Sequence, residues 1–179
     1  MSRVVILVGS VRKGGNTDLL ARSFADGAGK NNDVETVSVA DVQVAPCRGC
    51  NACYVSEGNV CVQKDDMDAI YAKLAEADVL VIASPVYFYG ISAQLKAVID
   101  RLHAPVRNTF RIGRLGLLLV GAAELPEMFD SIVRQYELTL RFFDLESIGT
   151  VFARGVRDVG DIQGSPVLKE AYELGASLR

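Results

Sequence analysis

Two stretches of this sequence hold side chains that could do chemistry. The first is GSVRKGGNT at residues 9–17, and the second carries all four cysteines in the spacing Cys47-x2-Cys50-x2-Cys53-x7-Cys61. Glycines and basic side chains at the start of a helix suit a phosphate group, because the first N–H groups of a helix are free. Cysteine thiolates suit a soft metal ion or an iron–sulfur cluster. The sequence therefore indicates one anion site and one thiolate site.

The glycine-containing stretch does not match two common nucleotide-binding motifs. A P-loop has a lysine and a hydroxyl residue after its second glycine, but Gly14 is followed here by Gly15 and Asn16. The dinucleotide fingerprint G-x-G-x-x-G is also missing from this stretch. We predict a site for a single terminal phosphate, built from these side chains: Ser10, Arg12, Lys13, Asn16 and Thr17. The alternative is that Asn16 or Thr17 only caps the helix.

The elements that must position these residues alternate along the chain between apolar and amphipathic runs. Continuous runs of valine, isoleucine and leucine are typical of a parallel sheet that is covered on both faces. They predict strands at 4–8, 34–39, 79–83, 115–121 and 148–153. The amphipathic runs predict helices at 17–29, 66–77, 92–102, 126–143 and 167–178. We expect an α/β three-layer sandwich, flavodoxin-like, with a five-stranded parallel sheet of order 2-1-3-4-5.

Three loops are expected to meet at the carboxyl edge of this sheet, where such folds bind ligands. They are residues 9–17, 84–90 and 121–126. The second reads SPVYFYG, and its three consecutive aromatic side chains cannot all point into the core, because successive side chains alternate between faces. We expect some of them to face a flat ligand, and the alternative is packing against a helix or a second copy of the chain.

Length and composition indicate a single folded domain. A chain of 179 residues, half of them hydrophobic and 23% charged, fits one folded domain over residues 1–179 and excludes a disordered chain. A net charge of −3 gives no general attraction to nucleic acid or anionic membranes, so neither is expected as a partner. The first apolar run is too short for a signal peptide, which predicts a cytoplasmic location. The irregular segment at about 41–64, which holds the cysteines, is the exception to the regular pattern.

Three segments together resemble a known family. GSVRKGGNT at 9–17, SPVYFYGISAQLKAVIDR at 84–101 and the cysteine run between them are similar to the NAD(P)H-dependent FMN reductases of the flavodoxin-like superfamily, and within these to the iron–sulfur flavoproteins. The resemblance implies an FMN-dependent oxidoreductase that passes electrons from a reduced donor, NAD(P)H or a redox protein, to a small-molecule acceptor. It also implies a homodimer or homotetramer.

The same resemblance implies roles for individual residues. It places the FMN phosphate on Ser10, Arg12, Asn16 and Thr17. It places the isoalloxazine ring against residues of the second loop: Pro85, Val86, Tyr87, Phe88, Tyr89 and Gly90. Gly121 and Ala122 are implied to close the site after the fourth strand. No catalytic side chain is expected, because the flavin itself carries the chemistry.

The cysteine spacing favours a [4Fe–4S] cluster on Cys47, Cys50, Cys53 and Cys61 and leaves other uses open. Three thiolates with two-residue gaps can surround one cluster while the fourth arrives from further along. Zinc more often takes two separated C-x-x-C pairs. A redox-sensing thiol set and ordinary free thiols are further alternatives. With a cluster, the chain would be an iron–sulfur flavoprotein. The first alternative is an NAD(P)H-dependent FMN or quinone reductase without a cluster, and the second is a flavin-free regulatory or zinc-binding module.

Overall fold

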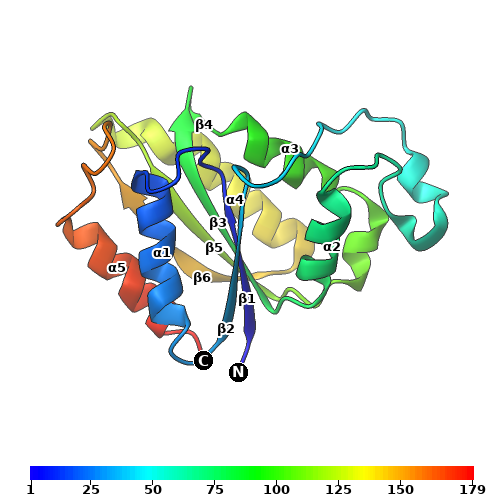
Figure 1. Cartoon of the computed structure of the whole chain (residues 1–179), viewed down its shortest axis with the longest axis horizontal. Helices are drawn as coiled ribbons and strands as arrows, with labels where there is room; N and C mark the ends of the chain where they lie inside the picture. Colours follow the sequence, from blue (N-terminus) through cyan, green and yellow to red (C-terminus); the bar gives the residue numbers. More distant parts are fainter.

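A central parallel sheet dominates the computed structural model, which describes all of residues 1–179 (Figure 1). Its strand order is β2-β1-β3-β5-β6, and a short strand, β4, pairs antiparallel with the end of β3. The strand bounds are β1 (Arg3–Val8), β2 (Asp33–Ser38), β3 (Val79–Tyr87), β4 (Gly90–Ile91), β5 (Arg114–Val120) and β6 (Glu146–Ala153). The predicted order is confirmed for the five parallel strands, whereas β4 was not predicted.

All five predicted helices are present in the structure. They are α1 (Asn16–Ala28), α2 (Met67–Ala75), α3 (Ala93–Arg101), α4 (Asp130–Phe143) and α5 (Pro166–Ala176). Short 3-10 helices occur at η1 (Ala52–Tyr54), η2 (Glu57–Asn59), η3 (Pro105–Thr109) and η4 (Pro126–Phe129). The first turn of the helix predicted at 126–143 is therefore the separate element η4. None of the helices combines the length and the apolar character needed to cross a membrane.

The alternation of side chains along β1 builds two cores. Val4, Ile6 and Val8 pack on one face with α1 and α5, and Val5 and Leu7 pack on the other face with α2, α3 and α4. Each of these β1 residues is at most 1% exposed. Because successive strand residues point to opposite faces, the continuous apolar runs of the sequence fill both cores at once. The result is the predicted three-layer arrangement (Figure 1).

The stretch SPVYFYG differs from its prediction as a loop. β3 continues through Tyr87, and the chain then turns back so that Val86 pairs with Ile91 and Tyr87 with Gly90. The two turn residues, Phe88 and Tyr89, have φ angles of 51° and 63°. Positive φ at both central residues matches the twist of a two-residue hairpin, but bulky side chains rarely adopt it. The prediction was wrong here because aromatic residues carry no turn signal.

The helices α1 and α5 approach each other closely because each has a glycine where they cross. A Cβ atom on Gly27 would lie 2.0 Å from the carbonyl oxygen of Tyr172, and one on Gly175 would lie 2.2 Å from that of Phe24. Neither position has room for a side chain. This contact fixes α1, whose N-terminus belongs to the candidate site.

Replacing Gly27 by alanine is expected to lower the free energy of unfolding by about 1–3 kcal/mol, because the added methyl group must push the backbones apart. Urea unfolding followed by circular dichroism measures this change. Gly113→Ala is the control, since a Cβ at Gly113 meets nothing within 4 Å. Equal stability of the two variants would contradict the close crossing.

Candidate functional site

A hollow of about 250 Å³ lies at the carboxyl edge of the sheet. It brings together eight of the residues predicted for the cofactor: Ser10, Arg12, Asn16, Thr17, Pro85, Val86, Tyr87 and Ala122. Five further residues line it: Gly15, Val120, Val156, Arg157 and Val159. Segments from the start, middle and end of the chain therefore meet in one place.

Five of the predicted residues do not line this hollow: Lys13, Phe88, Tyr89, Gly90 and Gly121. Phe88 is fully exposed at the hairpin turn, next to Tyr89 and Gly90. The hydroxyl of Ser131 donates to the carbonyl of Tyr89, which ties the hairpin to the first turn of α4. Gly121 lies beneath Met128, whose sulfur would be 2.5 Å from an added Cβ atom.

The turn before α1 leaves backbone N–H groups free. The Ser10 hydroxyl oxygen accepts from the Arg12 N–H at 3.1 Å, and the Gly15 N–H donates to the Arg12 carbonyl at 3.1 Å. At the helix start, the Leu19 N–H donates to the Gly15 carbonyl at 2.9 Å. The N–H groups of residues 16–18 precede this bond and have no carbonyl one turn earlier in the helix. Together with the helix dipole, they favour an anion at this point.

The side chain of Asn16 has a role that the sequence did not indicate. Its Nδ2 donates to the Asp158 carbonyl at 2.7 Å, and its Oδ1 accepts from the N–H groups of Gly160 and Ile162 at 3.1 and 3.4 Å. The amide thus holds the segment after β6 beside the turn that precedes α1. Its backbone N–H at the helix start is the group available to an anion.

Two arginines provide positive charge at the hollow. Arg12 and Arg157 both line it and are both exposed. Neither belongs to an ion pair within the chain. Lys13, in contrast, pairs with Asp41. Two uncompensated cations next to free N–H groups fit a phosphate dianion.

Arg157 was missed in the sequence. The loop after the last strand, which follows Ala153, was not counted among the loops at the carboxyl edge. The signal was available, since every parallel strand ends at this edge and the stretch RGVRD at 154–158 follows β6 directly.

The residues present fit FMN. The cationic end suits its phosphate, and the remaining wall offers Val86, Val120, Val156 and the half-exposed ring of Tyr87 to a flat aromatic group. A hollow with one polar end and one apolar wall can bind and orient such a cofactor.

The cysteine segment lies beside α2 and α3 at one end of the molecule, where Figure 1 shows it in cyan. Cys47 and Cys50 are exposed, whereas Cys53 and Cys61 are half-buried against the core beneath α2 and α3. The Gly49 N–H donates to the Cys47 sulfur at 3.4 Å, and Gln63 Nε2 donates to the Cys61 sulfur at 3.9 Å. None of the four lines the hollow.

The electrostatics of the two half-buried thiols differ. Burial raises the pKa of Cys53, and the nearby thiols of Cys61, Cys50 and Cys47 raise it further. Burial also acts to raise the pKa of Cys61, but the Gln63 N–H and the Arg101 guanidinium outweigh it, so that this pKa is lowered. The thiols are thus within electrostatic reach of one another, and the lowered pKa means that Cys61 loses its proton more readily than an ordinary cysteine.

The chemistry of this donor set fits an iron–sulfur cluster. All four ligands would be soft thiolates from one segment, and two of the sulfurs already accept N–H groups. The side chains as they stand are not gathered into a group that could hold a metal ion.

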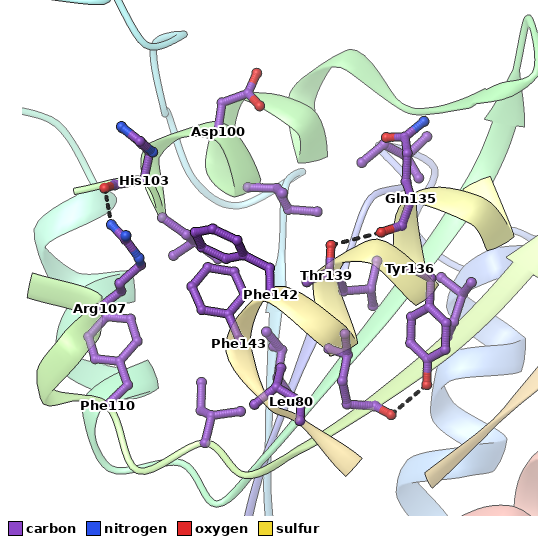
Figure 2. Close-up of a pocket in the computed structure, with 18 of the residues that line it drawn as sticks. Leu80, Asp100, His103, Arg107, Phe110, Gln135, Tyr136, Thr139, Phe142 and Phe143 are labelled. Atoms are coloured by element: carbon purple, nitrogen blue, oxygen red, sulfur yellow. Dashed lines mark hydrogen bonds between the residues drawn. The ribbon is translucent and has the colours of Figure 1, made fainter. Parts of the chain in front are cut away.

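A larger cavity of about 560 Å³ opens between α3, η3 and α4, and Figure 2 shows its lining. Most of its lining residues are hydrophobic, among them Leu80, Phe110, Phe142 and Phe143. The rings of Phe142 and Phe143 meet edge to face at 4.8 Å, and Phe142 is 74% exposed. The sheet is thus left partly open on this face, away from the residues predicted for the cofactor.

Comparisons with known proteins agree on one family. The sequence model of the family described as NADPH-dependent FMN reductase matches residues 2–138. An iron–sulfur flavoprotein of Methanocaldococcus jannaschii is 40% identical over 124 residues, 68% of this chain and 63% of that protein. One of Methanosarcina thermophila is 38% identical over 62% of this chain and 57% of that protein. The chain thus spans about three fifths of the length of these two relatives.

One relative and one solved structure match over nearly the whole chain. An iron–sulfur flavoprotein of Archaeoglobus fulgidus is 30% identical over 98% of this chain and 78% of its own length. The NAD(P)H:quinone oxidoreductase of Methanothermobacter marburgensis superposes with a TM-score of 0.77 over 99% of both chains, at 14% identity. At that identity, the structural likeness shows the fold alone.

Proposed function

The chain belongs to the NADPH-dependent FMN reductase family, and within it to the iron–sulfur flavoproteins, and from this premise we propose that it is an FMN-dependent oxidoreductase. NAD(P)H is the proposed donor and a small molecule the proposed acceptor. The observation that carries the proposal is the hollow at the sheet edge. There the start of α1, two unpaired arginines and the ring of Tyr87 converge.

Each part of the hollow has a proposed role. Ser10, Arg12, Thr17, Arg157 and the free N–H groups of residues 16–18 hold the FMN phosphate, and the Asn16 side chain keeps the Arg157 segment in place. Pro85, Val86, Tyr87 and Ala122 would hold the ring, and the residues expected beyond them are Phe88, Tyr89, Gly90 and Gly121. Bound FMN would supply the redox chemistry, namely hydride transfer from a reduced nicotinamide and electron transfer to an acceptor. The chain's own part is to anchor the phosphate and orient the ring.

Titration of the purified protein with FMN tests this function. We expect saturable binding of one FMN per chain, followed by FMN-dependent oxidation of NAD(P)H when a quinone is added as acceptor. A protein that binds no FMN would support a flavin-free regulatory or zinc-binding module instead. FMN binding without NAD(P)H oxidation would point to a redox protein as donor.

We also propose that Cys47, Cys50, Cys53 and Cys61 hold a [4Fe–4S] cluster. The all-thiol donor set supports it, as do the relatives named iron–sulfur flavoproteins. Zinc, a redox-sensing thiol pair and idle cysteines in a plain FMN or quinone reductase are the outcomes that compete with it.

We propose a homodimer or homotetramer, with α4 in the contact. Exposed apolar side chains at Leu138, Phe142 and Phe143, beside the open cavity, support this assignment. Light scattering after size-exclusion chromatography is expected to give a multiple of the chain mass of 19.3 kDa. Phe142→Glu should reduce that mass, whereas Lys169→Glu on the exposed side of α5 should not. A monomeric wild type would contradict the proposal.

A further inference from the structure

Arg101 is a buried charge outside the proposed FMN site. It is the last residue of α3, and its side chain is 0% exposed. Its Nη1 pairs with the carboxylate of Asp65, which is 15% exposed. A buried guanidinium is costly unless its partners are well placed, so its contacts define what it does here.

The guanidinium joins the two ends of the cysteine segment. Nη1 donates to the Ala45 carbonyl at 3.3 Å, and Nη2 lies at 3.5 Å from the Gln63 carbonyl. The paired carboxylate of Asp65 accepts from the Ala45 N–H at 3.0 Å. Arg101, Asp65, Ala45 and Gln63 together form what we call the clasp.

Further bonds run between the same two stems. Gln63 Nε2 donates to the Pro46 carbonyl at 3.2 Å, and the Gln43 N–H donates to the Asp66 carboxylate at 2.7 Å. The Asp66 N–H in turn donates a hydrogen bond to the Gln43 carbonyl at 3.2 Å. The segment with the four cysteines therefore leaves and re-enters the fold at adjacent points, and Arg101 is the charged group buried beneath them.

The Arg101 guanidinium acts on Cys61 as well as on its partner Asp65. Asp65 is the one carboxylate paired with Arg101, and the Nε atom of Arg101 is buried without a hydrogen-bond partner. The guanidinium also acts electrostatically on Cys61. A positive charge beside a cluster favours the reduced form, because reduction adds negative charge.

We propose that Arg101 is the positioning residue of the cysteine segment: it clasps the two stems together and keeps a positive charge beside Cys61, which raises the reduction potential of a cluster bound there. The effect on potential rests on the proposed cluster. The clasp itself is a property of the cluster-free chain.

Two variants separate the two effects. Arg101→Lys keeps the charge but cannot reach all three partners with one ammonium group, whereas Arg101→Met removes charge and clasp together. Arg3→Lys is the matched control, because Arg3 also joins separate segments through ion pairs with Asp33, Glu35 and Glu76 and begins β1, at the amino edge of the sheet.

Hydrogen exchange of the full, cluster-free chain is the first measurement. Backbone amides at 43–49 and 61–66 are expected to exchange at least tenfold faster in both Arg101 variants than in wild type, and to be unchanged in Arg3→Lys. The second measurement is a spectroelectrochemical titration after anaerobic loading with iron and sulfide. Arg101→Met is expected to shift the reduction equilibrium about tenfold toward the oxidised form, which is 59 mV for one electron, with Arg101→Lys close to wild type.

Wild-type exchange in the Arg101→Met variant would overturn the clasp, and a wild-type potential would overturn the charge effect. If Arg101→Met does not fold, the double variant Arg101→Met with Asp65→Leu removes both charges and is measured in its place. If the wild-type chain takes up no iron, the cluster proposal fails, while the exchange rates still decide whether the clasp exists.

Discussion

Replacing both Arg12 and Arg157 by alanine is expected to weaken FMN binding about 100-fold or more. Charged hydrogen bonds contribute roughly 1.5–3 kcal/mol each, and 1.4 kcal/mol corresponds to a factor of ten in affinity. Neither arginine has a carboxylate partner to lose, so their charge is available to the phosphate. Quenching of flavin fluorescence, titrated at one fixed salt concentration, measures the affinity.

Riboflavin separates a phosphate effect from general damage, because it carries the same ring without the phosphate. The double variant is expected to bind riboflavin as the wild type does. Arg134→Ala is the control substitution, since Arg134 is an exposed arginine of α4 paired with Glu137. An equal loss for both flavins would show that the arginines act on the ring or the fold, and unchanged FMN binding would remove them from the site.

The layers of the fold could be predicted because they depend on a local property of the sequence, the run of consecutive apolar residues in each strand. Residues 4–8 form a continuous apolar run, and the structure buries alternate members of it in opposite cores. The hairpin between β3 and β4 could not be predicted in this way. Phe88 and Tyr89 adopt left-handed backbone angles, which bulky side chains rarely do, and the bond from Ser131 to Tyr89 that ties the turn to α4 spans 42 positions.

The candidate site was predictable only in part, because some of its features depend on contacts between residues that are far apart in the sequence. The turn before α1 was found because its glycines and basic residues are neighbours in sequence. The role of the Asn16 amide depends on the Asp158 carbonyl, 142 positions away. Arg101 lies on an amphipathic helix, where an arginine is ordinarily exposed, but here it is buried and its guanidinium contacts Ala45 and Gln63 at the two ends of the cysteine segment.

Replacing Cys47, Cys50, Cys53 and Cys61 by serine is expected to abolish iron binding while FMN binding stays unchanged. A [4Fe–4S] cluster would give about four iron and four sulfide per wild-type chain after anaerobic loading, and hydroxyl groups are poor substitutes for its thiolate ligands. FMN should be unaffected, because none of the four cysteines lines the hollow at the sheet edge. Metal and sulfide analysis, with a flavin titration on the same samples, measures both quantities.

Val55→Ser is the matched control for this experiment, since it adds a hydroxyl at an exposed position of the same segment and removes no thiol. Sulfide is the decisive quantity, because zinc and a thiol pair both leave it at zero whereas a cluster requires it in equal number with iron. One zinc per chain without sulfide would contradict the cluster and show that the cysteines hold a structural zinc ion. If protein purified without oxygen contains neither metal nor sulfide, the result supports a flavin reductase whose cysteines are free. The retention of FMN in the serine variant tests, in turn, whether the two sites are as independent as their places in the fold indicate.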